Sequence, residues 1–191
     1  MILGFYGHSN SGKTTLIEKI CRNLEKENLK IAVIKHIPHK NFSIDIKTKD
    51  TGKFKNLGVD VVAFSPDETA FILGGMNFSD MISKLEHIDS YDVILVEGLK
   101  KQNIPKIRVG DCPMESMTIM DYKGLNDLKT ILKWIKNEIQ KEETVREEKR
   151  KPFVRIIQGE KIRTTKLKGM RVRTTKLKGI EIRTTKTMKT K

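Results

Sequence analysis

Apolar residues along the first 35 positions are spaced as in a strand, a helix and a second strand. The apolar run at residues 2–6 (ILGFY) precedes a loop rich in Gly, Ser and Asn. A helical spacing of apolar residues then follows at Leu16, Ile17, Ile20 and Leu24. Residues 31–35 (IAVIK) form a β-branched run that predicts a buried strand. This βαβ order predicts a parallel sheet with helices on its faces.

The rest of the first 140 residues continues the alternation of strands and helices. Apolar runs predict further strands at residues 59–65, 69–73, 91–98, 106–110 and 117–121. Two helices are predicted, one over residues 77–88 with Met81, Ile82 and Leu85 facing inward, and one beginning at Leu125. The run YDVILVEG at 91–98 is apolar without alternation, as is typical of a strand covered on both faces. We therefore expect an α/β fold with a mostly parallel sheet.

Composition divides the chain into a domain and a tail. Residues 1–140 carry the α/β pattern, and residues 141–152 are a mixed charge run that we interpret as a solvated helix end or linker. The phrase R-T-T-K-L-K-G then occurs nearly three times at ten-residue spacing within 153–191, in units starting near Lys161, Arg171 and Glu181, of which the last departs from it after Lys186. Each repeat joins a strand-like half to a K-L-K-G turn, which permits short β-strands.

The tail supplies nearly all of the net charge. The chain carries a formal charge of +14, and residues 151–191 hold 14 basic residues against two acidic ones. The domain is therefore nearly neutral. The tail lacks aromatic residues after Phe153, so it lacks the stacking platforms of single-strand binders. Two interpretations remain open, namely weak non-specific contact with nucleic acid or other anions, and a solubilising repeat with no partner.

Nothing in the sequence predicts a membrane protein or a secreted one. The longest apolar runs are too short to span a bilayer, and the N-terminal MILGFYGHS lacks the basic and apolar regions of a secretory signal. Cys21 and Cys112 match neither a disulfide framework nor a metal-binding pair. We expect a cytoplasmic protein without a membrane span.

The loop after the first strand fits the phosphate-binding pattern G-x-x-x-x-G-K-[ST]. It lies between an apolar strand and an amphipathic helix, which is the context that the pattern requires. Its backbone N–H groups would surround an anion, and the helix N-terminus would face the phosphates. Lys13 would reach the β- and γ-phosphates, and the Thr14 hydroxyl would bind Mg²⁺. The predicted nucleotide-binding residues are Gly7, His8, Ser9, Asn10, Ser11, Gly12, Lys13, Thr14 and Thr15.

Glu97 is the second candidate for chemistry. It stands at the carboxyl end of the buried strand VILVE, and ligands of open parallel sheets bind at that edge. Glu97 would meet Mg²⁺ directly or through water, or orient an attacking water. A strand-end carboxylate in solvent is the alternative. Lys13 and Glu97 are the predicted catalytic residues.

A polar segment follows the second strand at the same edge. It contains Lys35, His36 and His39, and downstream of these lie Asp45 and residues 49–51 (KDT). Pro38 argues against a helix that would present both histidines to one metal ion. On these residues alone, exposed loop histidines are the favoured interpretation.

Several motifs together resemble the molybdopterin-guanine dinucleotide biosynthesis protein B (MobB) family. They are GHSNSGKTTL, KHIPH, D-x-x-x-K-D-T and the strand YDVILVEGLK followed by IPKI, in that order within residues 1–136. The resemblance implies a P-loop protein that binds GTP and Mg²⁺, hydrolyses GTP weakly and is commonly a homodimer. Such proteins assist the molybdopterin guanylyltransferase, which attaches GMP to molybdopterin in making a molybdenum or tungsten cofactor.

The resemblance also implies roles for individual residues. The segment facing nucleotide or partner would comprise Lys35, His36, His39, Asp45, Lys49, Asp50 and Thr51. Gly98 and Lys100 would join Glu97 on the phosphate side, and Asp45 would join Thr14 and Glu97 as metal ligands. The chain departs from the family pattern in reading Thr48-Lys49-Asp50-Thr51 and in placing Pro38 before His39. It also lacks an Asn-Lys-x-Asp motif, so Asp121 is our candidate for reading guanine, since a carboxylate accepts from both base donors.

Two other functions are weighed against this one. A small-molecule or nucleotide kinase would use the same loop, but a kinase usually needs arginines that close over the transferred phosphoryl group. Only four arginines precede the tail, which are Arg22, Arg108, Arg146 and Arg150. An NTPase recruited to nucleic acid by its basic tail is the other alternative. The shortage of arginine also predicts slow hydrolysis unless a partner supplies one.

Overall fold

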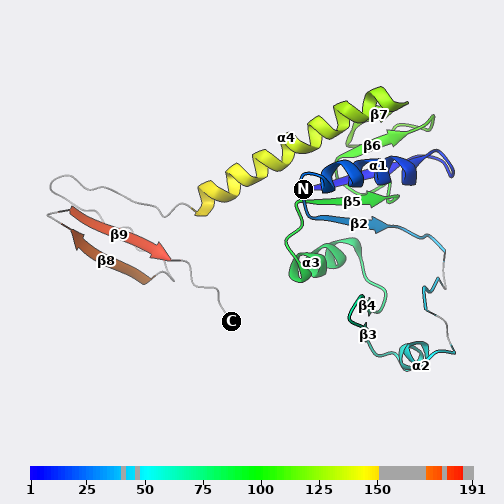
Figure 1. The fold of residues 1–191 in the computed structure, drawn as a ribbon, viewed down its shortest axis with the longest axis horizontal. Coiled ribbons are helices and arrows are strands. Elements are labelled where there is room, and N and C mark those ends of the chain that lie inside the picture. The colour runs from blue at the N-terminus through cyan, green and yellow to red at the C-terminus, as the bar shows by residue number, and fades with distance from the viewer. Residues whose placement is uncertain (40–41, 46–47, 151–170, 178–179, 187–191) are drawn as a thin grey trace. The chain divides into compact units, whose positions relative to one another are not determined.

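The computed structural model describes residues 1–39, 42–45, 48–150, 171–177 and 180–186. The chain divides into two compact units, Met1–Lys136 and Asn137–Lys191. Figure 1 traces the order of the elements along the chain.

A five-stranded parallel sheet forms the centre of the first unit. Its strands are β1 (Ile2–Tyr6), β2 (Ile31–Lys35), β5 (Val93–Glu97), β6 (Lys106–Val109) and β7 (Thr118–Tyr122). They lie in the order β2-β5-β1-β6-β7, and every neighbouring pair is parallel. The carboxyl ends of β1, β5 and β6 therefore share one edge. This arrangement confirms the α/β fold that the sequence predicts.

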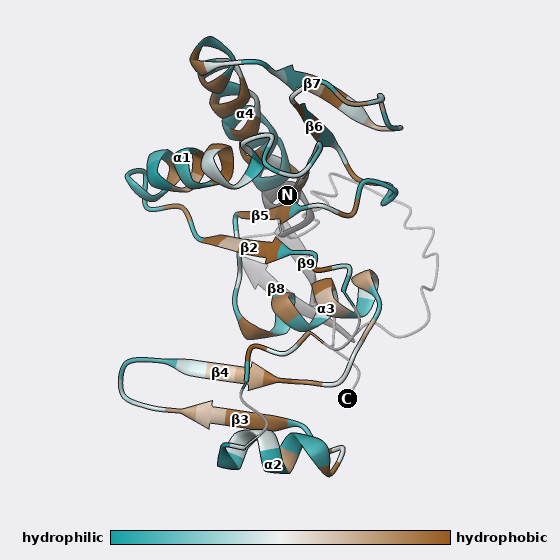
Figure 2. Cartoon of the chain, turned by 90° about the vertical axis from the view of Figure 1, so that its right-hand side faces the viewer, coloured by the Kyte–Doolittle hydropathy of each residue, from teal (hydrophilic) through white to brown (hydrophobic). Residues whose placement is uncertain are grey.

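Helices cover both faces of this sheet, as the sequence predicts. On one face, α3 (Phe78–Ile88) packs Met81, Ile82 and Leu85 against the buried side chains of Ile34, Ile94 and Val96. The helix α1 (Lys13–Glu25) and the part of α4 (Leu125–Arg150) that belongs to the first unit lie together on the other face (Figure 2). The buried face of α1 is made by Leu16, Ile17, Ile20 and Leu24. The strands β2 and β5 are brown in Figure 2 because apolar residues dominate them.

The first two strands after residue 58 form a separate sheet and do not join the central one. The strands β3 (Val61–Phe64) and β4 (Thr69–Ile72) pair with each other in an antiparallel hairpin. Beside them lies α2 (Asp50–Asn56), a seven-residue helix that the sequence analysis treats as loop. Its apolar positions are too few to show a helical period. A hydrogen bond from the Thr51 hydroxyl to Asp45 Oδ1 (3.0 Å) ties its first turn to the preceding segment.

The last helix agrees with the helix-end interpretation of the charge run rather than with a linker. The structure keeps α4 helical to Arg150, through most of the charge run at 141–152. Lys and Glu are good helix formers, and residues 141–150 contain neither Gly nor Pro, so this part of the run can extend a helix that is already nucleated. An ion pair between Lys141 Nζ and Glu138 Oε1 (2.6 Å) adds support along this segment.

The tail repeats form strands where the structure describes them. The strands β8 (Arg171–Leu177) and β9 (Ile180–Lys186) pair in antiparallel register, with Val172 opposite Thr185. These are the strand-like halves of the second and third repeats. The repeat that starts near Lys161 lies outside the described residues.

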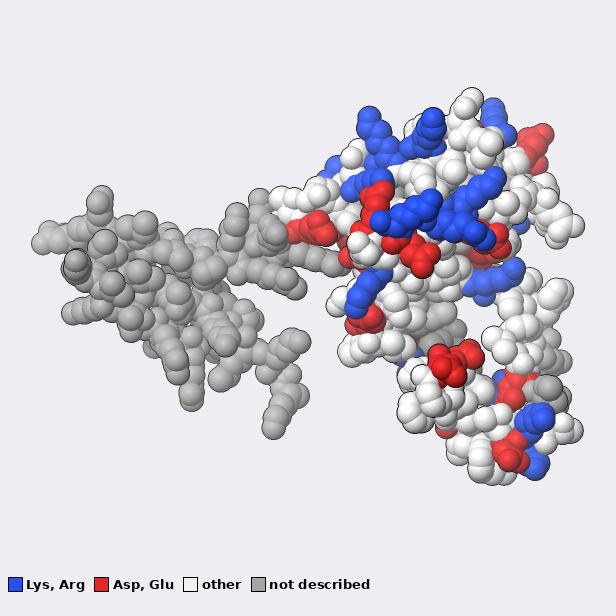
Figure 3. Space-filling view, viewed as in Figure 1, with Lys and Arg blue, Asp and Glu red and all other residues white. Residues whose placement is uncertain are grey.

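The surface of the first unit carries charges of both signs. Over much of the face in Figure 3, Lys and Arg side chains stand beside Asp and Glu side chains. Among the described residues, no helix is both long and apolar enough to cross a bilayer.

Candidate functional site

The phosphate loop connects β1 to the N-terminus of α1 at the shared sheet edge. Gly12 precedes the helix with φ of 90°, and no side chain caps the helix start. Such a φ favours glycine, because it is the left-handed region. The first turn of α1 also lacks acidic residues. The backbone N–H groups at this helix end and the positive end of the helix dipole are therefore suited to an anion.

Position 7 requires glycine because the end of strand β6 approaches its backbone closely. A Cβ at Gly7 would lie 2.1 Å from the Val109 carbonyl oxygen and 2.7 Å from Ser11 Oγ. The Ser11 hydroxyl is buried, and no hydrogen-bond partner for it exists among the described residues. A buried hydroxyl without a partner is costly unless a ligand supplies one. The loop thus offers a donor, besides its backbone, for a phosphate oxygen.

Lys13 reaches back from the helix over the loop. Its ammonium group donates to the carbonyls of Gly7 (3.1 Å) and His8 (2.6 Å). The cation is thereby held beside the backbone that would surround an anion, which is the position that the sequence pattern predicts for it.

Thr14 and Glu97 meet across the site. The Thr14 hydroxyl donates to Glu97 Oε2 (2.9 Å), and Lys35 Nζ lies 3.6 Å from Glu97 Oε1. A pocket of about 490 Å³ joins these residues to the phosphate loop, and it is lined by Ser9, Asn10, Ser11, Gly12, Lys13, Thr14, Thr15, Lys35 and Glu97. One pocket therefore collects residues 9–15 of the predicted phosphate loop, both predicted catalytic residues and Lys35.

The oxygens of Thr14 and Glu97 fit a magnesium ion, because Mg²⁺ takes oxygen ligands and is commonly held by one or two carboxylates plus substrate phosphates. The part of the chain that the structure describes contains no cluster of three His, Cys, Asp or Glu side chains that could hold a metal by itself.

The residues around Glu97 are positioned by backbone contacts. The His36 N–H donates to the Glu97 carbonyl (2.9 Å), and a Cβ on Gly98 would lie 3.2 Å from His36 Cβ. Gly98 has φ of 93° and donates its N–H to the Phe5 carbonyl (2.9 Å). Lys100 forms an ion pair with Glu115 instead of Glu97, with Lys100 Nζ 3.3 Å from Glu115 Oε1. His36 and Gly98 thus shape the strand end, whereas Lys100 is engaged away from the pocket.

The segment at residues 45–51 lies at a different pocket. Asp45 and Thr51 line a cavity of about 490 Å³ between α2 and the hairpin β3–β4, together with Phe42, Phe71 and Ile72. Asp50 is exposed and pairs with Lys53 Nζ (3.0 Å), while His39 and Lys49 are exposed. The structure therefore does not bring Asp45 together with Thr14 and Glu97, nor Asp50 and Thr51 with the phosphate loop.

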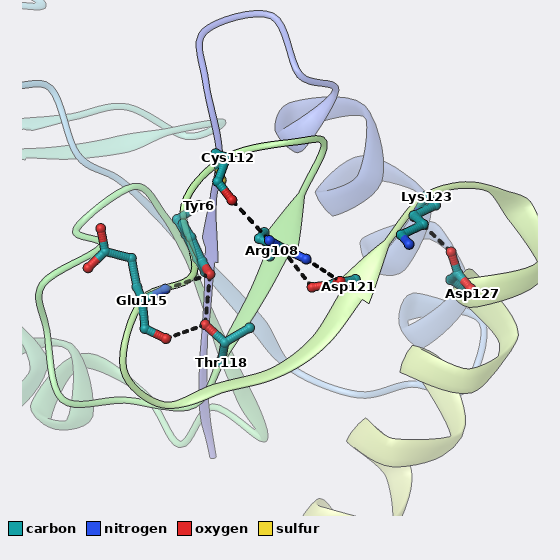
Figure 4. Close-up of polar contacts among 8 residues, drawn as sticks. All are labelled: Tyr6, Arg108, Cys112, Glu115, Thr118, Asp121, Lys123 and Asp127. Atoms are coloured by element: carbon teal, nitrogen blue, oxygen red, sulfur yellow. Dashed lines mark hydrogen bonds and ion pairs between the residues drawn. The ribbon is translucent and has the colours of Figure 1, made fainter.

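Asp121 is engaged by an arginine on the neighbouring strand. Arg108 on β6 donates from Nε to Asp121 Oδ1 (2.8 Å) and from Nη2 to Oδ2 (2.5 Å), as Figure 4 shows. Hydrogen bonding to this guanidinium lowers the pKa of the Asp121 carboxyl. Both oxygens expected to read guanine already accept hydrogen bonds from Arg108.

Lys106 is a buried residue to which the sequence analysis assigns no role. It is the lysine of the I-P-K-I motif, and its side chain is fully buried with Nζ donating to the Gln102 carbonyl (2.5 Å). Burial lowers the pKa of its ammonium group. Its stem crosses Gly4 so closely that a Cβ there would lie 2.9 Å from Lys106 Cγ. Lys106 therefore ties the segment after Glu97 to the sheet, and its place in the motif was the only available signal.

The fold belongs to the P-loop NTPase class. Its parallel strands have the order β2-β5-β1-β6-β7, and a glycine-rich loop leads from the central strand β1 into α1. Two crystal structures show the same fold. A structure of molybdopterin-guanine biosynthesis protein B is 26% identical with a TM-score of 0.54, over 73% of this chain and 99% of its own. A Bacillus subtilis MobB structure is 19% identical with a TM-score of 0.52, over 69% of this chain and 96% of its own.

The chain belongs to the MobB family, because the family model for molybdopterin guanine dinucleotide synthesis protein B matches residues 2–134. A molybdopterin-guanine dinucleotide biosynthesis adapter protein of Haemophilus influenzae is 36% identical over 112 residues, 56% of this chain and 61% of that protein. A Methanocaldococcus jannaschii relative named for the same role is 37% identical over 111 residues, 56% of this chain and 45% of that protein. The matched region spans less than two thirds of either relative.

Proposed function

We propose that this protein is a GTP-binding adapter in the synthesis of the molybdopterin guanine dinucleotide cofactor, of molybdenum or tungsten. It acts where GMP is attached to molybdopterin, in contact with the molybdopterin guanylyltransferase. The observation that carries the proposal is the single pocket lined by residues 9–15 of the phosphate loop, which include Lys13, and by the Thr14–Glu97 pair. The names of the relatives supply the pathway.

In this proposal each group has a distinct task. The loop N–H groups and Lys13 hold the β- and γ-phosphates, and Thr14 and Glu97 hold Mg²⁺, which offsets the phosphate charge when bound. No arginine lines the pocket formed by the described residues. Hydrolysis is therefore slow unless a partner contributes a cation. Cys21 and Cys112 are free thiols, which suits a reducing compartment, so we place this work in the cytoplasm.

The proposed role is tested by a pull-down with the molybdopterin guanylyltransferase, with and without GTP. We expect association that depends on GTP, together with faster guanylylation of molybdopterin. No association under either condition, combined with no effect on guanylylation, would overturn the adapter role. A basic tail that recruits the protein to nucleic acid would instead show binding that falls steeply with salt and is lost on deletion of residues 151–191.

Glu97→Gln is expected to weaken the contribution of Mg²⁺ to GTP binding by about tenfold to a hundredfold. The amide keeps the shape of the carboxylate but loses the charge that attracts the ion. GTP affinity measured in the presence of EDTA should stay near that of the unmodified protein. Glu86→Gln, an exposed substitution on α3, is the matched control. An unchanged Mg²⁺ dependence in Glu97→Gln would remove Glu97 from the metal site.

We also propose that the protein works as a homodimer. Val62, Phe64 and Phe71 expose 55%, 84% and 52% of their surface on the hairpin β3–β4. Val62 pairs with Phe71, and Phe64 follows two residues after Val62, so all three share one face of the hairpin. Phe64→Ser is expected to shift sedimentation from dimer to monomer. A wild-type protein that sediments as a monomer at all concentrations contradicts the dimer.

A further inference from the structure

The two ends of the phosphate pocket differ, and this difference indicates on which side the base of a bound nucleotide would lie. Thr14 and Glu97 mark the end of the pocket on the β5 side of β1. A magnesium ion held by Thr14 and Glu97 would offset the charge of the terminal phosphates, so the β- and γ-phosphates would belong on that side. The α-phosphate, ribose and base must then extend toward the opposite neighbour of β1, which is β6.

The segment that follows β6 borders the phosphate loop. The Val109 carbonyl oxygen occupies the space beside Gly7, where a Cβ would come within 2.1 Å of it. A Cβ on Gly110 would lie 3.2 Å from Ser11 Cβ, and Gly110 has φ of 77°. Residues 110–117 therefore begin in direct contact with the loop that would hold the phosphates.

Three polar contacts hold residues 110–117 in place (Figure 4). Arg108 Nη1 donates to the Cys112 carbonyl (3.0 Å), and the Glu115 N–H donates to the Tyr6 hydroxyl (3.0 Å). The Thr118 hydroxyl donates to the Glu115 carbonyl (2.6 Å). The segment is thus anchored to β6, β1 and β7, so its free side chains are presented by a positioned backbone.

Among the acidic side chains on β7 and in the segments that follow β6 and β7, Asp111 differs from the others. Asp121 is bound by Arg108, Glu115 lies 3.3 Å from Lys100 Nζ, and Asp127 accepts from the N–H groups of Lys123 (2.7 Å) and Gly124 (3.1 Å). Asp111 is exposed, and within the described ranges its carboxylate has no hydrogen bond or ion pair. It stands one residue after the contact between Gly110 and Ser11.

We propose that Asp111 reads the guanine base, in place of Asp121. A carboxylate accepts two hydrogen bonds, and guanine presents its N1–H and its 2-amino group side by side as two donors. Adenine presents an acceptor at N1, which a carboxylate repels. Met114, 66% exposed in the same segment, supplies an apolar surface near the base. This inference rests on the proposed binding of GTP and names the residue that selects it.

The test changes the hydrogen-bond donors and acceptors at residue 111 and, in parallel, those of the base. Asparagine offers one donor and one acceptor, and xanthine carries a carbonyl where guanine carries the 2-amino group. For Asp111→Asn we expect GTP affinity to fall roughly tenfold to a hundredfold and affinity for xanthosine triphosphate to rise. Both affinities are measured by calorimetry with Mg²⁺ on the full chain, and circular dichroism verifies folding.

Two further variants make the result specific. Asp67→Asn, an exposed aspartate in the turn between β3 and β4, should leave both affinities unchanged. Asp121→Asn should not reverse the preference between the two nucleotides. Unchanged GTP affinity in Asp111→Asn, or a reversed preference in Asp121→Asn, overturns the assignment of Asp111 while the proposed function stands. A wild-type protein that binds no GTP overturns both.

Discussion

Lys13→Ala is expected to abolish GTP binding while leaving the fold intact, with affinity falling by about a hundredfold or more. The ammonium group lies over the phosphate loop, where it donates to the carbonyls of Gly7 and His8. Its hydrogen bonds to phosphate would be charge-assisted, which makes them the strongest single contacts available to the ligand. Calorimetry with GTP and Mg²⁺ measures the loss.

The fold is expected to survive this change because Lys13 contributes nothing to the apolar face of α1, which is made by other side chains. Thermal unfolding should therefore be close to that of the unmodified protein. Lys26→Ala, which removes an exposed lysine just after the same helix, is the matched control and should bind GTP normally. Normal GTP affinity in Lys13→Ala would refute the phosphate loop as the nucleotide site.

Gly7→Ala is expected to damage both the site and the stability of the protein. The new methyl group would lie 2.1 Å from the Val109 carbonyl oxygen, so the phosphate loop or β6 must move. Forcing a group into a packed position costs roughly 1–3 kcal/mol of stability. Displacing the loop also removes the Ser11 hydroxyl and the backbone N–H groups from the positions that suit a phosphate. We expect GTP binding to fall below detection and the melting temperature to drop.

Gly74→Ala is the control for Gly7→Ala, because a Cβ at Gly74 meets no atom within 4 Å. That variant should retain both GTP affinity and melting temperature. Calorimetry and thermal unfolding monitored by circular dichroism separate the two effects. If Gly7→Ala binds GTP as tightly as Gly74→Ala does, then the close approach of Val109 does not shape the site.

Local spacing explains which parts of the fold were predicted correctly. The apolar faces of α1 and α3 and the apolar run of β5 extend over consecutive residues, so their periods can be read directly. The helix α2 has only seven residues, too few to show an apolar period, and a side-chain hydrogen bond from Thr51 to Asp45 in the preceding segment holds its first turn. The extension of α4 to Arg150 depends on propagation from an established helix rather than on an apolar period.

The same distinction applies to the candidate site. Glu97 could be assigned from its position because every parallel strand ends at one edge. Asp45 and Asp121 could not, because their surroundings depend on residues from other elements. The cavity beside α2 contains Asp45, and Arg108 on β6 binds Asp121. The choice between Asp121 and Asp111 likewise depends on which carboxylate has a partner.

By itself, the sequence determined the phosphate loop, the βαβ order, the strand end at Glu97 and the family, because each is written in adjacent residues whose chemistry is local. Only the tertiary structure decided which side chains meet. In the structure Thr14 donates to Glu97, and Arg108 pairs with Asp121. The Val109 carbonyl lies against Gly7, and the Asp111 carboxylate has no partner among the described residues. The reason is physical: strand order and register set these contacts, and neither can be read from the order of residues along the chain.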